Sequence, residues 1–163
     1  MTTRQSKGQA KLDSARGMAQ WTTIYQAYNA IFKLTELTLL PHSLSLPQLH
    51  LLCVLKKGGG ILTTGEIGRA MVKASQTITG LVDRLEEPGM VERVFDRRDR
   101  RKTWVRLTDK GESKLAGAFP VADRLAEEIS AALTDQELED MQVNLEKLQS
   151  AAMERLAGAL ERP

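Results

Sequence analysis

The densest chemistry in this sequence is a run of seven consecutive charged residues, from Asp96 to Lys102. Four of the seven are arginines, whose planar guanidinium groups stay charged and pair with phosphate through two parallel hydrogen bonds. Such a run is ordinarily an exposed loop, and its arginines are suited to phosphate contacts along a nucleic acid. The candidate contact residues in the run are Arg97, Arg98, Asp99, Arg100 and Arg101.

Two β-prone segments flank this charged run, at residues 91–95 and 103–107. Both are rich in Val, Phe, Thr and Trp, which are enriched in strands. The pattern predicts a β-hairpin with the charged run at its tip. From Glu92 to Arg106, seven basic residues face three acidic ones, a local excess of +4, whereas the whole chain carries only +2. We therefore expect a hairpin on which a phosphate backbone could use the positive charge.

A helix is predicted directly before the hairpin, after a short linker at residues 72–74 and with Ser75 as its N-cap. Pro88 and Gly89 end it. Its apolar stripe is Ile78, Leu81, Val82 and Leu85. Its outward face is Gln76, Gly80, Asp83 and Arg84, with Thr77 and Thr79 at the margins. Gln pairs with adenine, Thr contacts phosphate or a thymine methyl group, and Arg suits phosphate, whereas a solvated surface is the alternative interpretation.

Two shorter helices are predicted upstream, each starting with a capping box. Ser45 is followed three residues later by Gln48, and Thr63 by Glu66. The first of these helices ends at the flexible turn of Gly58–Gly60. The second helix and the one after it are joined by a tight turn, which is the helix-turn-helix pattern.

The ordered set IGRAMVKASQTITGLVDRLEEPGMVER, DRRDRR and VRLTDKG resembles the MarR (multiple antibiotic resistance regulator) family of winged helix-turn-helix repressors. The resemblance covers residues 46–117 and implies an all-α fold with a small β-hairpin wing. Asp99 and Arg101 match the family's D-x-R pattern, in which the Asp braces an Arg directed at the minor groove. Many members carry a basic residue where this chain has Gly80, so a guanine contact is not expected there.

The family resemblance implies a single domain over residues 14–163, with a winged helix-turn-helix lobe at 46–111. Helices at 14–45 and 112–163 would form the dimer interface. The implied function is a ligand-responsive repressor that binds a pseudo-palindromic double-stranded operator as a homodimer. The expected DNA contacts are Ser75, Gln76, Thr77, Thr79, Arg84, Arg97, Arg98, Asp99, Arg100 and Arg101.

Two other classes of function compete with this interpretation. A winged-helix module that binds proteins instead of DNA would have little use for four arginines within five residues, Arg97 to Arg101. An enzyme is disfavoured because the sequence has no HExxH, GxSxG or paired His/Cys arrangement. Two histidines are too few for a metal site, so we expect neither a metal nor a cofactor.

A long helix is predicted from Ser14 to Leu40, and Pro41 breaks it. Its aromatic stripe is Trp21, Tyr25, Tyr28 and Phe32. The stripe fits ordinary core or dimer packing, or one wall of a pocket for a flat apolar molecule. The candidate residues for binding a small aromatic or amphipathic effector are Trp21, Tyr25, Tyr28 and His50.

Two more helices are predicted after the hairpin. Thr108 caps the first, which tolerates Pro120 as a kink or restart. A third capping box, Thr134 with Glu137, opens the last helix. This helix keeps an apolar stripe from Leu138 to Ala159, which needs a partner to bury it.

The remaining features concern the ends of the chain and its location. Residues 1–13 are polar without apolar periodicity and predict a flexible arm. The single cysteine cannot form an intrachain disulfide, and we expect Cys53 to be a buried small hydrophobe beside Leu49 and Leu52. No apolar run reaches the length of a membrane span or resembles a signal peptide, so a cytoplasmic protein without membrane contacts is expected.

Overall fold

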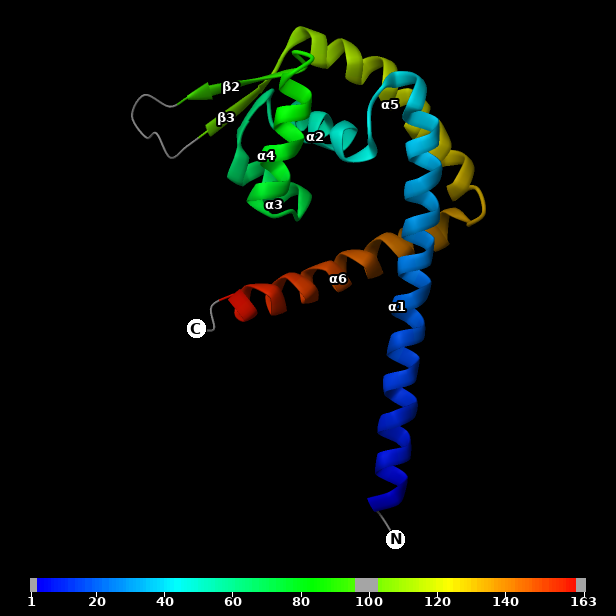
Figure 1. Ribbon diagram of the computed structural model, residues 1–163. Coiled ribbons are helices and arrows are strands. Elements are labelled where there is room, and N and C mark those ends of the chain that lie inside the picture. The colour runs from blue at the N-terminus through cyan, green and yellow to red at the C-terminus, as the bar shows by residue number, and fades with distance from the viewer. Residues whose placement is uncertain (1–2, 96–102, 161–163) are drawn as a thin grey trace. The chain divides into compact units, whose positions relative to one another are not determined.

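The computed structural model describes residues 3–95 and 103–160. Its helices are α1 (Thr3–Leu39), α2 (Leu46–Lys57), α3 (Thr64–Met71), α4 (Ser75–Glu86), α5 (Asp109–Ser130) and α6 (Asp135–Leu160), with a short 3-10 helix η1 at Leu40–His42 (Figure 1). Its strands are β1 (Ile61–Thr63), β2 (Val91–Phe95) and β3 (Thr103–Leu107). The chain divides into two compact units, Met1–Ala122 and Asp123–Pro163. The mainly helical architecture with a small sheet confirms the predicted fold class.

The sheet is antiparallel throughout, with strand order β1-β3-β2. The predicted hairpin is present, with Val91 opposite Leu107 and Phe95 opposite Thr103. Strand β1 was not predicted, because three residues are too few to show an alternating pattern. It follows the glycine turn directly, and the backbone N–H of Leu107 donates to the carbonyl of Gly60 at 2.8 Å.

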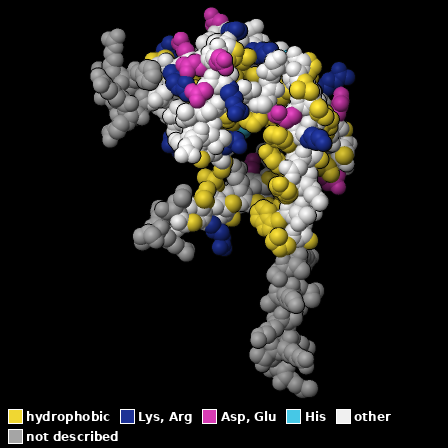
Figure 2. Space-filling model, viewed as in Figure 1, with side chains coloured by type: hydrophobic (Ala, Val, Ile, Leu, Met, Phe, Trp, Pro, Cys, Tyr) yellow, Lys and Arg dark blue, Asp and Glu magenta, His cyan; other side chains and the backbone are white. Residues whose placement is uncertain are grey.

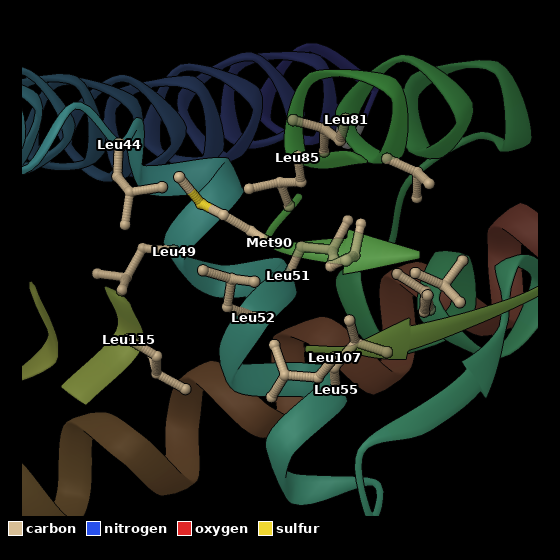
Figure 3. Packing of buried hydrophobic residues seen from close by; sticks show 14 of the residues in the cluster. Leu44, Leu49, Leu51, Leu52, Leu55, Leu81, Leu85, Met90, Leu107 and Leu115 are labelled. Carbon is tan, nitrogen blue, oxygen red and sulfur yellow. The ribbon is translucent and has the colours of Figure 1, made fainter. Parts of the chain in front are cut away.

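The hydrophobic core of the first unit lies where α2, α3 and α4 pack against the sheet (Figure 3). All four residues of the predicted α4 stripe are buried, which confirms the expected inward face of this helix. Burying each such side chain contributes roughly 1.5–3 kcal/mol. The opposite face of α4 is thereby fixed toward solvent. The fully buried large side chains are Leu39, Leu51, Leu52, Leu55, Ile67, Ile78, Val82, Leu85, Val91 and Val105.

The predicted capping boxes of α2 and α3 are confirmed. The backbone N–H of Ser45 donates to Gln48 Oε1 at 2.8 Å, and that of Thr63 to Glu66 Oε2 at 2.7 Å. The predicted cap of α4 is wrong: its N-cap is Ala74, with no side-chain cap, and Ser75 is the first helical residue. The left-handed Val72 turns the chain so that it enters the helix one residue earlier than expected.

Helix α1 begins at Thr3, well before the predicted start at Ser14. Most of the segment predicted as a flexible arm is therefore helical, because Gln, Lys, Ala and Arg are good helix formers even without an apolar stripe. Hydrophobic side chains lie at the surface along α1 (Figure 2). In the described part of the chain no single helix has the length and apolarity of a membrane span, although the bent pair 17–42 and 46–57 meets both criteria.

The end of the wing is joined to α5 through Thr108 and Gly111. The Thr108 hydroxyl lies 2.8 Å from the carbonyl oxygen of Gly89 and 3.0 Å from that of Met90, and it accepts from the backbone N–H of Gly111 at 3.1 Å. A Cβ at Gly111 would lie 2.1 Å from the Met90 carbonyl oxygen. Only glycine fits there, which explains the glycine at the end of the segment VRLTDKG. The bond from the Gly111 N–H to the Thr108 hydroxyl confirms Thr108 as the predicted cap of α5.

Candidate nucleic-acid interface

The outward face of α4 is polar and exposed. Arg84 is exposed, and it makes no ion pair with any other residue that the structure describes. The Thr79 hydroxyl donates to the carbonyl of Ser75 at 3.1 Å, which holds that side chain against its own helix. The surface therefore offers amide, hydroxyl and guanidinium groups to a partner. The exposed α4 residues that were predicted to contact DNA are Ser75, Gln76, Thr77, Thr79 and Arg84.

The turn that leads into α4 is tight and holds an unusual backbone conformation. Val72 adopts a left-handed backbone conformation with a φ of 51°, although its side chain is β-branched. The backbone N–H of Lys73 donates to the carbonyl of Gly68 at 2.9 Å, which closes the end of α3. A Cβ at Gly68 would lie 3.2 Å from the Lys73 carbonyl oxygen, so the glycine lets the linker between α3 and α4 pack closely against α3.

Arg93 on β2 ties the base of the wing to α4. Its Nη2 lies 2.6 Å from Asp83 Oδ1, its Nη1 donates to Glu86 Oε2, and its backbone N–H donates to Glu86 Oε1 at 2.8 Å. Burial acts to lower the pKa of the Arg93 guanidinium, but the hydrogen bonds to Asp83 and Glu86 outweigh it and the pKa is raised. The arginine therefore stays charged and fixes the wing against the helix.

Two of the basic residues on the strands of the hairpin are already paired with carboxylates. Arg93 contributes to the positive excess of the hairpin, yet its guanidinium is held by two carboxylates of α4. Arg106 is also paired, with 2.8 Å between its Nη1 and Glu92 Oε1. The remaining basic residues of the hairpin lie in the segment 96–102, which is outside the described residues. The predicted wing contacts that fall there are Arg97, Arg98, Asp99, Arg100 and Arg101.

The sequence contained a signal for the role of Arg93. Asp83 and Glu86 are three residues apart on one helix, so their carboxylates lie on neighbouring turns. An arginine at the start of the following strand is within reach of both. Nothing local in the sequence shows that β2 returns alongside α4, so the spacing alone does not link the three residues.

A groove of about 670 Å³ lies between α2 and α5. At its rim the Lys56 ammonium pairs with Glu112 Oε1 at 2.6 Å. Burial, followed by the charges of Lys73 and Lys57, lowers the pKa of His50. Burial raises the pKa of Cys53, and Lys57 partly opposes it. The lining residues are His50, Cys53, Lys56, Lys57, Glu112, Leu115, Ala116, Phe119 and Pro120.

The predicted effector residues are not brought together in this groove. His50 lines it, whereas Trp21, Tyr25 and Tyr28 are exposed on α1 and do not line it. The ring centroids of Tyr28 and Phe32 are 5.7 Å apart, so these two members of the predicted aromatic stripe are in contact on α1. Cys53 is half-buried and packs against the core, close to the expected role.

Comparison with known proteins identifies related sequences and folds. Residues 42–102 match the sequence model of the MarR family. The chain is 40% identical over 88 residues to the HTH-type transcriptional regulator TtmR from Methylorubrum extorquens (strain PA1), which covers 54% of this chain and 45% of TtmR. The chain spans about half the length of the curated relatives it matches, such as 45% of TtmR and 52% of HosA from Escherichia coli.

Two solved structures share the fold. One is an organohalide-sensing transcriptional regulator in its 2,4-dichlorophenol-bound form, with a TM-score of 0.78, 21% identity, and coverage of 83% of this chain and 80% of that chain. The other is a cysteine-to-serine mutant of MarR from E. coli complexed with operator DNA, with a TM-score of 0.75, 22% identity, and coverage of 82% and 95%. At these identities the likeness concerns the fold alone.

Proposed function

We propose that this chain, whose residues 42–102 belong to the MarR family, is a transcriptional regulator that binds a pseudo-palindromic operator as a homodimer. The observation that carries the proposal is the exposed polar face of α4, held beside the wing by Arg93. An exposed helix face of this kind fits the major groove, and a wing fixed to the same helix reaches the adjacent backbone.

The proposed contacts divide into those that read bases and those that position the protein. Gln76 would pair with an adenine in the major groove, and Arg84 would contact phosphate. In the wing, Asp99 would brace Arg101 for insertion into the minor groove. Ser75, Thr77 and Thr79 would contact the backbone or a thymine methyl group, and Arg97, Arg98 and Arg100 would contact phosphates.

A second copy of the chain would cover the apolar surfaces on the terminal helices, within residues 14–45 and 112–163. Helices that each expose this many large apolar side chains are unusual on a monomer. Two copies would place two recognition helices about one helical turn apart, roughly 34–36 Å. The exposed apolar residues are Met18, Trp21, Ile24, Tyr25, Tyr28, Ile31, Leu34 and Leu37 on α1, and Met141, Val143, Leu145, Leu148, Met153 and Leu156 on α6.

The regulator would act in the cytoplasm as a repressor that a small aromatic or amphipathic molecule releases from DNA. The groove beside His50 has the volume and apolar floor of a small-molecule site. The aromatic face of α1, with Trp21, Tyr25 and Tyr28, supplies the other candidate contacts. An effector changes DNA affinity only if it binds the free and DNA-bound states differently.

Selection of DNA fragments by the purified protein, followed by gel-shift titration at several salt concentrations, tests the proposal. We expect a two-fold symmetric site and an affinity that falls steeply with salt, because phosphate contacts release counterions. Gln76→Ala should relax base preference at one position in each half-site. A single asymmetric half-site, or salt-independent binding, would contradict the proposal. A protein-interaction module would select no fragment.

A further inference from the structure

Gly80 occupies the middle of the recognition helix α4 on the side opposite the buried stripe. Gln76 and Asp83, about one turn before and after it, are exposed on the same face. A Cβ built at Gly80 would have no neighbouring atom within 4 Å. The protein itself therefore gives no steric reason for a glycine at this position.

A glycine there weakens the helix. Glycine is the poorest helix former after proline because it loses the most backbone freedom on folding. Helix α4 has little local support to offset this, since its N-cap Ala74 makes no side-chain cap. The φ of Gly80 is not in the left-handed region, so the backbone conformation does not require glycine either. What remains is the close approach of another molecule to the helix backbone.

The chemistry of the exposed spot restricts what can approach. Helix geometry commits the N–H and C=O groups of Gly80 to bonds within α4, so the position presents only its Cα hydrogens. Those hydrogens offer van der Waals contact but no strong hydrogen bond. In the major groove of DNA the one apolar group that the base pairs present is the C5-methyl of thymine.

We propose that Gly80 is a specificity-determining residue that receives the C5-methyl group of one thymine in each half-site. This inference rests on the proposed DNA-binding function. The missing side chain lets α4 lie deeper in the groove between Gln76 and Asp83. Arg93 pairs with the carboxylate of Asp83 at 2.6 Å, which offsets its negative charge beside that approach.

The test uses the full-length protein and the operator obtained by fragment selection. Each thymine of a half-site is replaced in turn by deoxyuridine, which removes only the methyl group. Wild type should lose about fourfold in affinity at one position, the size expected for one buried methyl group. Gly80→Ala should bind the thymine operator at least tenfold more weakly than wild type. At that same position it should bind the deoxyuridine operator better than the thymine operator.

This reversal of preference would support the inference, because the alanine methyl and the thymine methyl compete for one space. Gly117→Ala is the matched control, since Gly117 is also inside a helix with nothing within 4 Å of a Cβ. Both variants should raise the midpoint of thermal unfolding, and Gly117→Ala should keep wild-type affinity and thymine preference. A raised midpoint in Gly80→Ala shows that its weaker binding is not misfolding.

Three results would overturn the inference. Wild-type affinity in Gly80→Ala would mean that nothing approaches this position. A loss that no deoxyuridine substitution relieves would place the clash on the sugar-phosphate backbone and exclude the thymine contact. Failure of the wild type to select any operator would instead refute the proposed function, and the inference with it.

Discussion

Arg93 on β2 and Asp83 on α4 form an ion pair with 2.6 Å between Nη2 and Oδ1, and the same guanidinium also bonds Glu86. The Arg93 side chain is only 18% exposed, whereas that of Asp83 is 59% exposed. The pair neutralises a carboxylate on the face that would meet DNA and links that face to the root of the wing. These bonds therefore tie the recognition helix to β2.

Removing this link should destabilise the fold. Arg93→Ala leaves two carboxylates facing each other without a cation, and we expect a loss of about 1–2 kcal/mol in the free energy of unfolding, measured with urea. Arg93→Lys should lose less, since one ammonium retains the charge but cannot hold both acids. Arg106→Ala is the control. Its pair with Glu92 is half-exposed, so a change within about 0.5 kcal/mol is expected. Equal losses in the two alanine variants would refute the special role of Arg93.

Relieving the backbone at Val72 should stabilise the protein. Its φ of 51° is unfavourable for a β-branched residue and natural for glycine. Val72→Gly should therefore raise the free energy of unfolding by about 0.5–1 kcal/mol. Val143 is the control, because it has the same 47% exposure but lies inside helix α6. Val143→Gly should lower stability, and the same sign in both variants would exclude strain at Val72.

Gly111 should be intolerant of any side chain. Gly111→Ala places a methyl group against the carbonyl of Met90 and the side chain of Leu107, and we expect a loss of about 1–3 kcal/mol on urea unfolding. Gly117→Ala, in the same helix with open space around it, should gain up to about 1 kcal/mol. An unchanged free energy of unfolding in Gly111→Ala would show that the joint between the wing and α5 can relax.

The apolar stripe of α6 should control assembly. Leu148 is 45% exposed in the single chain, and Leu148→Glu should shift sedimentation from dimer toward monomer, because a charge cannot be buried without a partner. Gln149→Glu adds the same charge one residue away and off the stripe, and it should remain a dimer. A stable Leu148→Glu dimer would move the interface elsewhere.

Stability should depend on pH through His50. Its pKa lies below the ordinary 6.5, so the unfolded chain takes up a proton before the folded chain does. The contribution of neutral His50 to the free energy of unfolding is complete above pH 6.5 and is lost as the pH falls through the lowered folded pKa. His50 is exposed, so solvent screening should keep the effect below about 1 kcal/mol. Urea unfolding at pH 7 and pH 5 should show a larger drop for wild type than for His50→Gln, and parallel curves would contradict this.

Features set by neighbouring residues could be predicted from the sequence. The buried stripe of α4 follows from helical periodicity. The capping box of α6, with 2.8 Å between the Thr134 N–H and Glu137 Oε2, follows from a three-residue spacing. Features that depend on the folded path of the chain were missed. The bonds of Arg93 require β2 to return beside α4, and the cap at Ala74 depends on the left-handed Val72.

The candidate site also has a part that could be predicted from the sequence and a part that could not. The polar face of α4 could be predicted because its orientation is the complement of the buried stripe. The groove beside His50 could not, because it forms between α2 and α5, which are far apart in the sequence. Helical spacing indicated the aromatic surface on α1, but spacing within one helix does not show which other element faces it.

Thr108 is the only residue between β3 and α5, so no loop is available to absorb movement at this joint. Its hydroxyl and the close contact of Gly111 with Met90 also clamp the first turn of α5 to the start of β2. A molecule in the groove would contact Leu115 and Phe119 on α5, one to three turns beyond the clamp. Because this first turn is fixed to both β2 and β3, α5 could not shift beside the groove without displacing these two strands.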